Sequence, residues 1–391
     1  MKQFLLTTLV GLGTWGWGSA QSESPVTREG GYWVRTIQGN LDTSASDRLR
    51  VDTVGNVMLH GEPVEQGRYT LTLRVRAGDA RSAATEMDQI SVKTGAEGGW
   101  TYLKVGPPWA GRANLTLTVT APKALRQVKV LTAGGKVQAS DWNGELQART
   151  AGGEIVVDHI GGPANVETGG GTIQVGSVTG SFKGASGGGS IRVQNAGSAV
   201  QVETLGGEIL VHQAAGPVQA STGGGNIRIE HAGSTVVART AGGLIQVQEA
   251  DGPVTAESSG GAIQVNSAHG VRCESAGGAI RLRNVAGAVR AFASSGNILA
   301  ELGGASGFAN SVLSTNAGDI TVFIPSNLAL TIEATNESGG SGRIVSDFAQ
   351  IRARSAPVPG APVAAEGALN GGGPVLRVNV MGGTIYLREA K

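Results

Sequence analysis

The sequence has a single cysteine, Cys273, among 391 residues, so an exported form of this chain has no internal disulfide to stabilise it. It also lacks an excess of charge of either sign, because 31 Lys and Arg residues face 30 Asp and Glu residues. A net charge of +1 provides no strong field for nucleic acid or an anionic membrane. We therefore expect no nucleic-acid partner.

Aromatic residues are scarce, at 4% of the chain, and between residues 131 and 300 only Trp142, Phe182 and Phe292 occur. An interior built there must be thin. Glycine, by contrast, is abundant, with 64 residues. It does not recur every third residue, which excludes collagen, and 40% hydrophobic residues are too many for a disordered glycine-rich chain. The chain is therefore expected to fold and to use its glycine in a repeat.

Residues 1–20 have the pattern of a secretory signal peptide. Lys2 precedes an apolar stretch from Phe4 to Gly13, and small residues up to Ala20 follow it. The stretch is far shorter than the ~20 residues that span a bilayer, which disfavours the alternative of an uncleaved anchor. No second apolar run of that length follows. We expect cleavage after Ala20, no membrane span in the mature chain, and an extracytoplasmic location: periplasmic, cell-surface or secreted.

A Gly-Gly pair recurs at seven successive steps of eighteen residues. The pairs begin at Gly134, Gly152, Gly170, Gly188, Gly206, Gly224, Gly242 and Gly260. Each unit divides into two nine-residue halves in which apolar and polar residues alternate, the period of a β-strand with one buried face. The pattern predicts an all-β fold, a parallel β-solenoid with about 18 residues and two strands per coil, regular over residues 128–302.

Aligned units place apolar residues in vertical columns. One column of the first half reads Ile155, Ile173, Ile191, Ile209, Ile227, Ile245, Ile263, Ile280 and Ile298. One of the second half reads Val200, Val218, Val236, Val254, Val271 and Val289. The glycines are expected at the corners, where glycine adopts the positive φ angles that tight corners need.

A hydroxyl column lies two residues before each glycine pair. It comprises Thr132, Thr150, Thr168, Ser186, Thr204, Thr222, Thr240, Ser258 and Ser275. Its parity points inward, so we expect a hydroxyl ladder that satisfies backbone groups at a corner. An ice-binding threonine array is excluded, because it needs outward Thr-x-Thr pairs and the outward neighbours here are mixed.

The repeat GGxIxV, as in GGEIVV and GGTIQV, resembles a bacterial family of exported β-strand-repeat proteins of unknown function, often described as adhesins. The segments REGGYWVRTIQGNL at Arg28 to Leu41 and GGTIYLRE at Gly382 to Glu389 are similar to that family too. The resemblance implies a parallel β-helix outside the cytoplasm with a surface or adhesive role, and it supplies no catalytic residues. Calcium-binding β-rolls share the 18-residue coil, but their aspartate position is Val or Ile here.

The two ends differ from the repeat. Residues 21–127 are predicted to form an N-terminal β-rich cap domain with one short helix, Asp79 to Gln89, which Asp79 caps and which carries Ala80, Ala84 and Met87 on one face. Residues 303–391 are expected to be irregular C-terminal coils with a mobile Pro/Gly-rich loop at 355–374. Closing strands follow at Val375 to Val380 and Thr384 to Arg388.

An aromatic platform for sugar rings is an alternative role for part of the cap. It would consist of Trp100, Tyr102 and Trp109, although tryptophan more often belongs to a buried core.

The outward-facing residues are the candidates for catalytic or metal-binding chemistry. Glu257 and Glu274 form one carboxylate pair with a spacing like that of retaining glycosidases, on a face expected to be flat and without a cleft. His159 and His231 share an offset but lie four coils apart, so no metal bridges them. Cys273 lies in an inward column and is expected to be inert. We predict no catalytic, cofactor-binding or metal site.

The function predicted from the sequence is a non-catalytic exported β-solenoid that serves as an adhesin or a surface structural or interaction module. Two alternatives stay open: a periplasmic carbohydrate-binding or polysaccharide-degrading β-helix protein, and a self-assembling envelope scaffold. The expected partner is an unknown envelope or extracellular molecule, glycan or protein, with self-association also possible.

Overall fold

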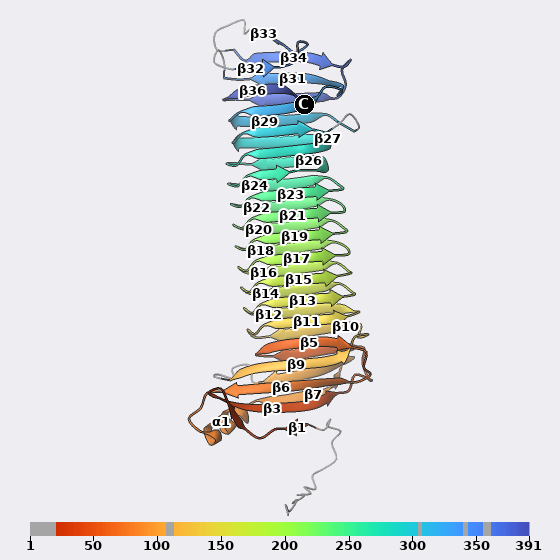
Figure 1. The fold of residues 1–391 in the computed structure, drawn as a ribbon, viewed down its shortest axis with the longest axis vertical. Helices are drawn as coiled ribbons and strands as arrows, with labels where there is room; N and C mark the ends of the chain where they lie inside the picture. The colour runs from red at the N-terminus through yellow and green to blue at the C-terminus, as the bar shows by residue number, and fades with distance from the viewer. Residues whose placement is uncertain (1–20, 107–112, 304–306, 339–342, 355–360, 391) are drawn as a thin grey trace, which may run out of the picture.

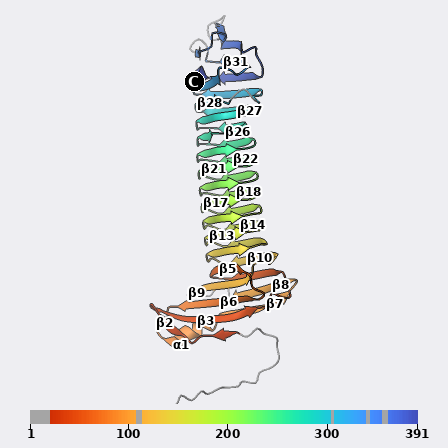
Figure 2. The ribbon, with the colours of Figure 1, turned by 45° about the vertical axis from the view of Figure 1, so that its right-hand side comes forward.

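The structure is a computed structural model that describes residues 21–106, 113–303, 307–338, 343–354 and 361–390. The predicted signal peptide, residues 1–20, lies outside the described residues. The described chain is nearly all β, and its strands form one long hydrogen-bonded sheet with mostly parallel pairing. Successive coils stack along a single axis into a β-solenoid-like rod (Figures 1 and 2).

Two kinds of strand alternate along the regular part. The first kind starts after a glycine pair and comprises β11 (Val137–Trp142), β13 (Ile155–Ile160), β15 (Ile173–Val178), β17 (Ile191–Ala196), β19 (Ile209–Ala214), β21 (Ile227–Ala232), β23 (Ile245–Ala250) and β25 (Ile263–Val265). The second kind comprises β10 (Gln127–Thr132), β12 (Glu145–Thr150), β14 (Ala164–Thr168), β16 (Phe182–Ser186), β18 (Val200–Thr204), β20 (Val218–Thr222), β22 (Val236–Thr240), β24 (Val254–Ser258) and β26 (Ala268–Ser275).

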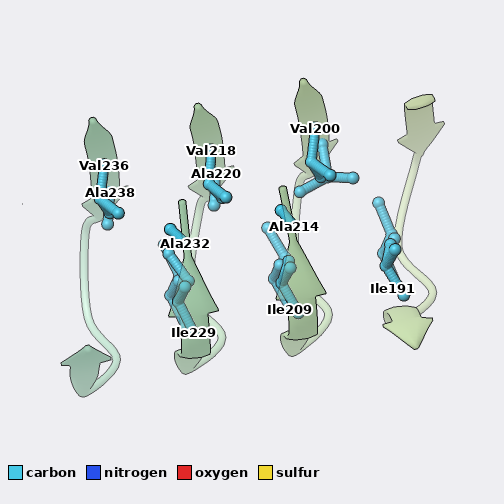
Figure 3. Packing of buried hydrophobic residues seen from close by; sticks show 14 of the residues in the cluster. Ile191, Val200, Ile209, Ala214, Val218, Ala220, Ile229, Ala232, Val236 and Ala238 are labelled. Carbon is cyan, nitrogen blue, oxygen red and sulfur yellow. The ribbon is translucent and has the colours of Figure 1, made fainter. Parts of the chain in front are cut away.

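Each strand pairs in parallel with the strand one repeat later. The register steps by eighteen residues in most coils, as between Ile191 and Ile209, and by seventeen from Val254 to Val271. The predicted columns therefore exist. Ile209 and Val218 are at most 1% exposed, and their equivalents on the neighbouring coils lie beside them in the interior (Figure 3). Because Ile and Val columns on one side face Val and Ala columns on the other, burial is nearly complete without a wide core.

The repeat glycines act differently from the prediction. Among the described residues, no glycine of the eight regular pairs has a positive φ angle. Instead, a Cβ on the second glycine of a pair would collide with the coil below: at Gly225 it would lie 2.0 Å from the carbonyl oxygen of Gly207. A Cβ on the first glycine, Gly224, would meet nothing within 4 Å. The second glycine is thus required by the close stacking of corners and not by its φ angle.

The hydroxyl column is buried, as predicted, and it links neighbouring coils. Thr222 is 4% exposed; its Oγ1 donates a hydrogen bond to the carbonyl oxygen of Gly207 at 2.9 Å and accepts one from the amide of Gly225 at 3.2 Å. The same pair of bonds recurs at Thr150, Thr168 and Thr204. The column therefore supplies partners for the backbone at the glycine corner.

The N-terminal unit contains β1 (Ser22–Glu23), β2 (Thr27–Glu29), β3 (Tyr32–Leu41), β4 (Arg48–Thr53), β5 (Asn56–Glu62), β6 (Gly67–Val75), β7 (Ser91–Glu97), β8 (Trp100–Gly106) and β9 (Asn114–Pro122). Its strands β4 and β5 pair in parallel with β10 and β11. Beyond them, β8 and β9 continue the parallel stacking, and antiparallel β7, β6 and β3 complete the end. The sheet therefore continues across residue 128, where the sequence predicts a domain boundary.

Helix α1 (Ala80–Met87) is capped by Asp79, whose side chain accepts a hydrogen bond from the amide of Ser82 at 2.8 Å. Its buried residues are Ala83 and Met87. The predicted face was wrong in part, because Ala80 is exposed and Ala84 only half-buried. Among the described residues, no helix is both long and apolar enough to cross a membrane.

Toward the C-terminus, β27 (Ile280–Ser295) extends across both halves of a coil, and β28 (Ile298–Leu302), β29 (Ser311–Ala317) and β30 (Ile320–Pro325) continue the stack. The last strands are β31 (Leu330–Asn336), β32 (Arg343–Ser346), β33 (Arg352–Arg354), β34 (Val363–Leu369), β35 (Val375–Val380) and β36 (Thr384–Ala390).

Two predictions about this end need correction. The final strands do not close the stack, because β35 inserts between β29 and β31, and β36 between β30 and β32. The stretch 355–374 is not a loop throughout: residues 363–369 form β34, antiparallel to β31, while residues 355–360 lie outside the described residues.

Candidate functional site

Two open depressions lie one after the other along one edge of the coils. The first, about 570 Å³, includes Arg149, Glu167, Glu203 and Leu205; the second, about 520 Å³, includes Arg239, Glu257, Glu274 and Phe292. Both follow the outward column of the second-kind strands, whose members pair coil by coil. Equivalent surface positions therefore recur about every 4.8 Å along the rod.

The carboxylate pair lies within the second depression, so the prediction of a flat face was wrong at this place. Glu257 and Glu274 are direct Cα partners on β24 and β26. Short side chains, including Ser259 and Ala276, line the depression together with the longer charged ones.

Each carboxylate of the pair is held by an arginine. Arg239 Nε lies 2.9 Å from Glu257 Oε2, and Arg272 Nη2 lies 2.6 Å from Glu274 Oε1. At the other depression, Arg149 Nη2 lies 2.9 Å from Glu167 Oε1. Ion pairs of opposite charge therefore recur along this solvent-exposed face of the sheet.

Two large apolar side chains are exposed on this edge. Leu205 is 71% exposed and Phe292 is 41% exposed. Leu205 belongs to the first depression and Phe292 to the second. Together with the ion pairs, they give the edge a mixed polar and apolar character.

The first-kind strands, together with β5, carry a second set of polar residues. Four of the five histidines lie there, and each of them faces a carboxylate. The Nδ1-to-oxygen distances are 3.1 Å for His60 and Asp141, 3.1 Å for His159 and Asp158, 2.5 Å for His212 and Glu230, and 3.5 Å for His231 and Glu249. The register keeps His159 and His231 four coils apart, as predicted. The sequence analysis did not identify these pairs, although for His212 and His231 the acidic partner lies eighteen positions later, at the spacing of one coil.

A third depression of about 350 Å³ lies beside Met58, His60, Ser140 and Asp158. His60 Nδ1 is 2.9 Å from Ser140 Oγ and 3.1 Å from Asp141 Oδ2. A nucleophile relay uses one ring nitrogen for the hydroxyl and the other for the carboxylate. Here both partners approach the same nitrogen, so the group does not have that geometry.

Cys273 is fully buried between Ala256 and Ala291 of its column. Burial raises the pKa of the Cys273 thiol well above its usual range, because the thiolate would be desolvated. The predicted inward position is confirmed.

Of the predicted aromatic platform, Trp100 and Tyr102 are half-buried on β8, and Trp109 lies outside the described residues. Arg48 stacks over Trp100 at 5.6 Å, and Lys104 over Tyr102 at 4.8 Å, measured to the ring centroids. The two rings thus contact cations of the cap itself.

No protein-family model and no curated protein matches the chain. Three solved structures are similar to it at low identity. A "putative cell adhesion protein" from Clostridium sporogenes is 9% identical, with 91% of this chain and 100% of that chain covered and a TM-score of 0.20. A "putative adhesin" from Bacteroides fragilis is 12% identical, covering 63% and 95%, at a TM-score of 0.31. A "putative lipid binding protein" from Parabacteroides distasonis is 14% identical, covering 74% and 97%, at 0.23.

Proposed function

We propose that this chain is an exported, non-catalytic β-solenoid that serves as an adhesive or interaction module of the cell surface. Its binding surface is the edge with the two depressions from Arg149 to Phe292. The observation that carries the proposal is the collinear recurrence of equivalent positions on successive coils, because such an edge offers the same contact repeatedly to an extended polymer.

The residues of the edge favour a partner with little net charge. Arg149 and Arg239 already form ion pairs with carboxylates of the chain. The groove, by which we mean the two depressions along this edge, therefore presents a nearly neutral polar surface. Leu205 and Phe292 add apolar area on which the faces of sugar rings or apolar side chains of an extended peptide can pack. A glycan or protein polymer of the envelope fits this combination better than a polyanion.

Binding should be measured with the secreted full-length product on immobilised envelope glycans and, separately, on envelope proteins. Replacing Leu205 and Phe292 together by Ser is expected to weaken binding by roughly tenfold or more, because the exposed apolar contacts are lost. Met58→Ser is the matched control, since Met58 is 44% exposed but lies outside the groove. Equal binding by the double variant, or no binding to any polymer, would refute the proposal.

Catalytic cleavage of a polysaccharide is the second candidate, and the depression around Glu257 and Glu274 favours it. A retaining glycosidase needs one of its two carboxyl groups as a proton donor. Both carboxylates here accept from arginines, which supports the non-catalytic reading. Release of reducing sugar that disappears in both Glu257→Gln and Glu274→Gln would establish the enzyme instead.

A further inference from the structure

The edge formed by the first-kind strands brings together one histidine and two carboxylates. His231 is the penultimate residue of β21, Glu249 lies on β23, and Asp251 follows that strand. One ligand atom from each of the three lies within 4.8 Å of the others. We propose that these three residues bind a divalent transition-metal ion, with Zn²⁺ as the best chemical match.

The coil register creates the cluster from residues far apart in sequence. His231 and Glu249 are direct Cα partners in the parallel pair of β21 and β23. Their side chains therefore project from adjacent coils in the same direction, and His231 Nδ1 lies 3.5 Å from Glu249 Oε2. Two ligands of a tetrahedral Zn²⁺ site, with bonds of about 2.0–2.1 Å, are separated by about 3.4 Å. The pair thus already has close to the spacing that the metal requires.

The third ligand is brought near by the turn. Ala250 points into the core and is 2% exposed, so Glu249 and Asp251 on either side of it both face outward. The amide of Asp251 donates a hydrogen bond to the carbonyl oxygen of Ala232 at 2.9 Å. Because Ala232 follows His231, this bond fixes Asp251 beside the histidine.

The donor set determines which ions fit. An imidazole with two carboxylates suits Zn²⁺ and related transition metals, whereas Ca²⁺ and Mg²⁺ prefer oxygen donors alone. The His231 side chain is 36% exposed and that of Glu249 is 60% exposed, so an ion can enter from solvent. Three protein ligands leave a coordination position for water or for a group of a bound partner.

The site is independent of the proposed binding groove, which lies over the second-kind strands. Its test uses the full chain, stripped of metal with a chelator and titrated with Zn²⁺ by calorimetry. Wild-type protein is expected to bind Zn²⁺ with a dissociation constant on the order of 10 µM. His231→Ala and Glu249→Gln should each weaken that binding by roughly tenfold or more.

His269→Ala is the matched control, because His269 is exposed on another strand and should not alter the titration. Co²⁺ provides a second readout, since its visible absorption reports on the ligands directly and should change in His231→Ala. All replaced side chains are at least partly exposed, so folding is expected to survive and is checked by circular dichroism. Equal Zn²⁺ affinity in wild type, His231→Ala and Glu249→Gln, or no binding by wild type below about 1 mM, would overturn the proposal.

Discussion

At the scale of single residues, the second glycine of each pair has the strictest requirement in the repeat. The backbone of the preceding coil lies so close to this glycine that a single methyl group would not fit between them, as at Gly225 and Gly243. The first glycine of the pair is open to solvent, so two neighbouring identical residues carry different constraints.

Gly225→Ala is expected to lower the free energy of unfolding by about 1–3 kcal/mol, because its Cβ would have to push the Gly207 carbonyl away. The adjacent change Gly224→Ala should stay within about 0.5 kcal/mol of wild type. Urea denaturation of the two variants compares them directly. Similar losses at both positions would argue against the stacking explanation.

Thr222→Val tests the hydroxyl column while preserving side-chain shape. The change removes the bonds to the Gly207 carbonyl and the Gly225 amide, and we expect a loss of about 1–3 kcal/mol in unfolding free energy. Thr235→Val is the control, because Thr235 is exposed. Thermal or urea unfolding serves as the measurement, and a Thr222→Val protein as stable as the control would contradict the role assigned to the column.

At the scale of elements, helix α1 depends on its cap. Hydrogen bonds from the backbone and side chain of Ser82 hold the pKa of the Asp79 carboxyl below its usual range. A lowered folded-state pKa means that the stabilisation is complete above the unfolded-state pKa of about 3.8 and is lost as the pH falls through the lower folded value.

We therefore expect α1 to open in Asp79→Ala at neutral pH and, in wild type, only under acid conditions below about pH 3.8. Hydrogen exchange over residues 82–87, corrected for the intrinsic pH dependence, measures both effects. Glu86→Gln serves as the control, since it removes a charge from the same helix without touching the cap. An Asp79→Ala helix as protected as wild type would show that packing of Met87 alone suffices.

At the scale of the whole molecule, the ends of the stack differ from its middle. At the C-terminal end, β35 lies between β29 and β31, and β36 lies between β30 and β32. Strand β34 pairs antiparallel with the other edge of β31. Antiparallel strands also complete the N-terminal end. Both ends therefore interrupt the parallel register that would otherwise accept another coil.

A chain that ends at Leu302 would expose strands β27 and β28, which in the full chain pair with β29 and β30. We expect this truncated protein to assemble into larger species than the full chain at the same concentration, because unpaired parallel edges accept further strands. Light scattering and sedimentation measure the difference. Identical size distributions would show that the C-terminal strands do not protect the edge, and extensive assembly of the full chain would instead favour a scaffold role.

The periodic residues by themselves determined the coil length, the two strand types, the inward columns and the burial of Thr222 and Cys273. They could do so because residue i contacts residue i+18 wherever the coils are uniform. Contacts between neighbouring coils can then be predicted from the repeat length alone. Sequence also located Asp79 as a cap, because capping depends on residues only three positions apart.

Only the tertiary structure decided what departs from that uniformity. The insertion of β35 depends on a chain that leaves the stack and returns, which no local period encodes. The role of Gly225 depends on the distance between stacked corners. The depression at Glu257 depends on the sizes of the side chains that surround it. The approach of His231 to Glu249 and Asp251 likewise requires both the coil register and the turn after β23. A cluster of metal-ligating side chains of this kind therefore depends on how the folded chain places them in space.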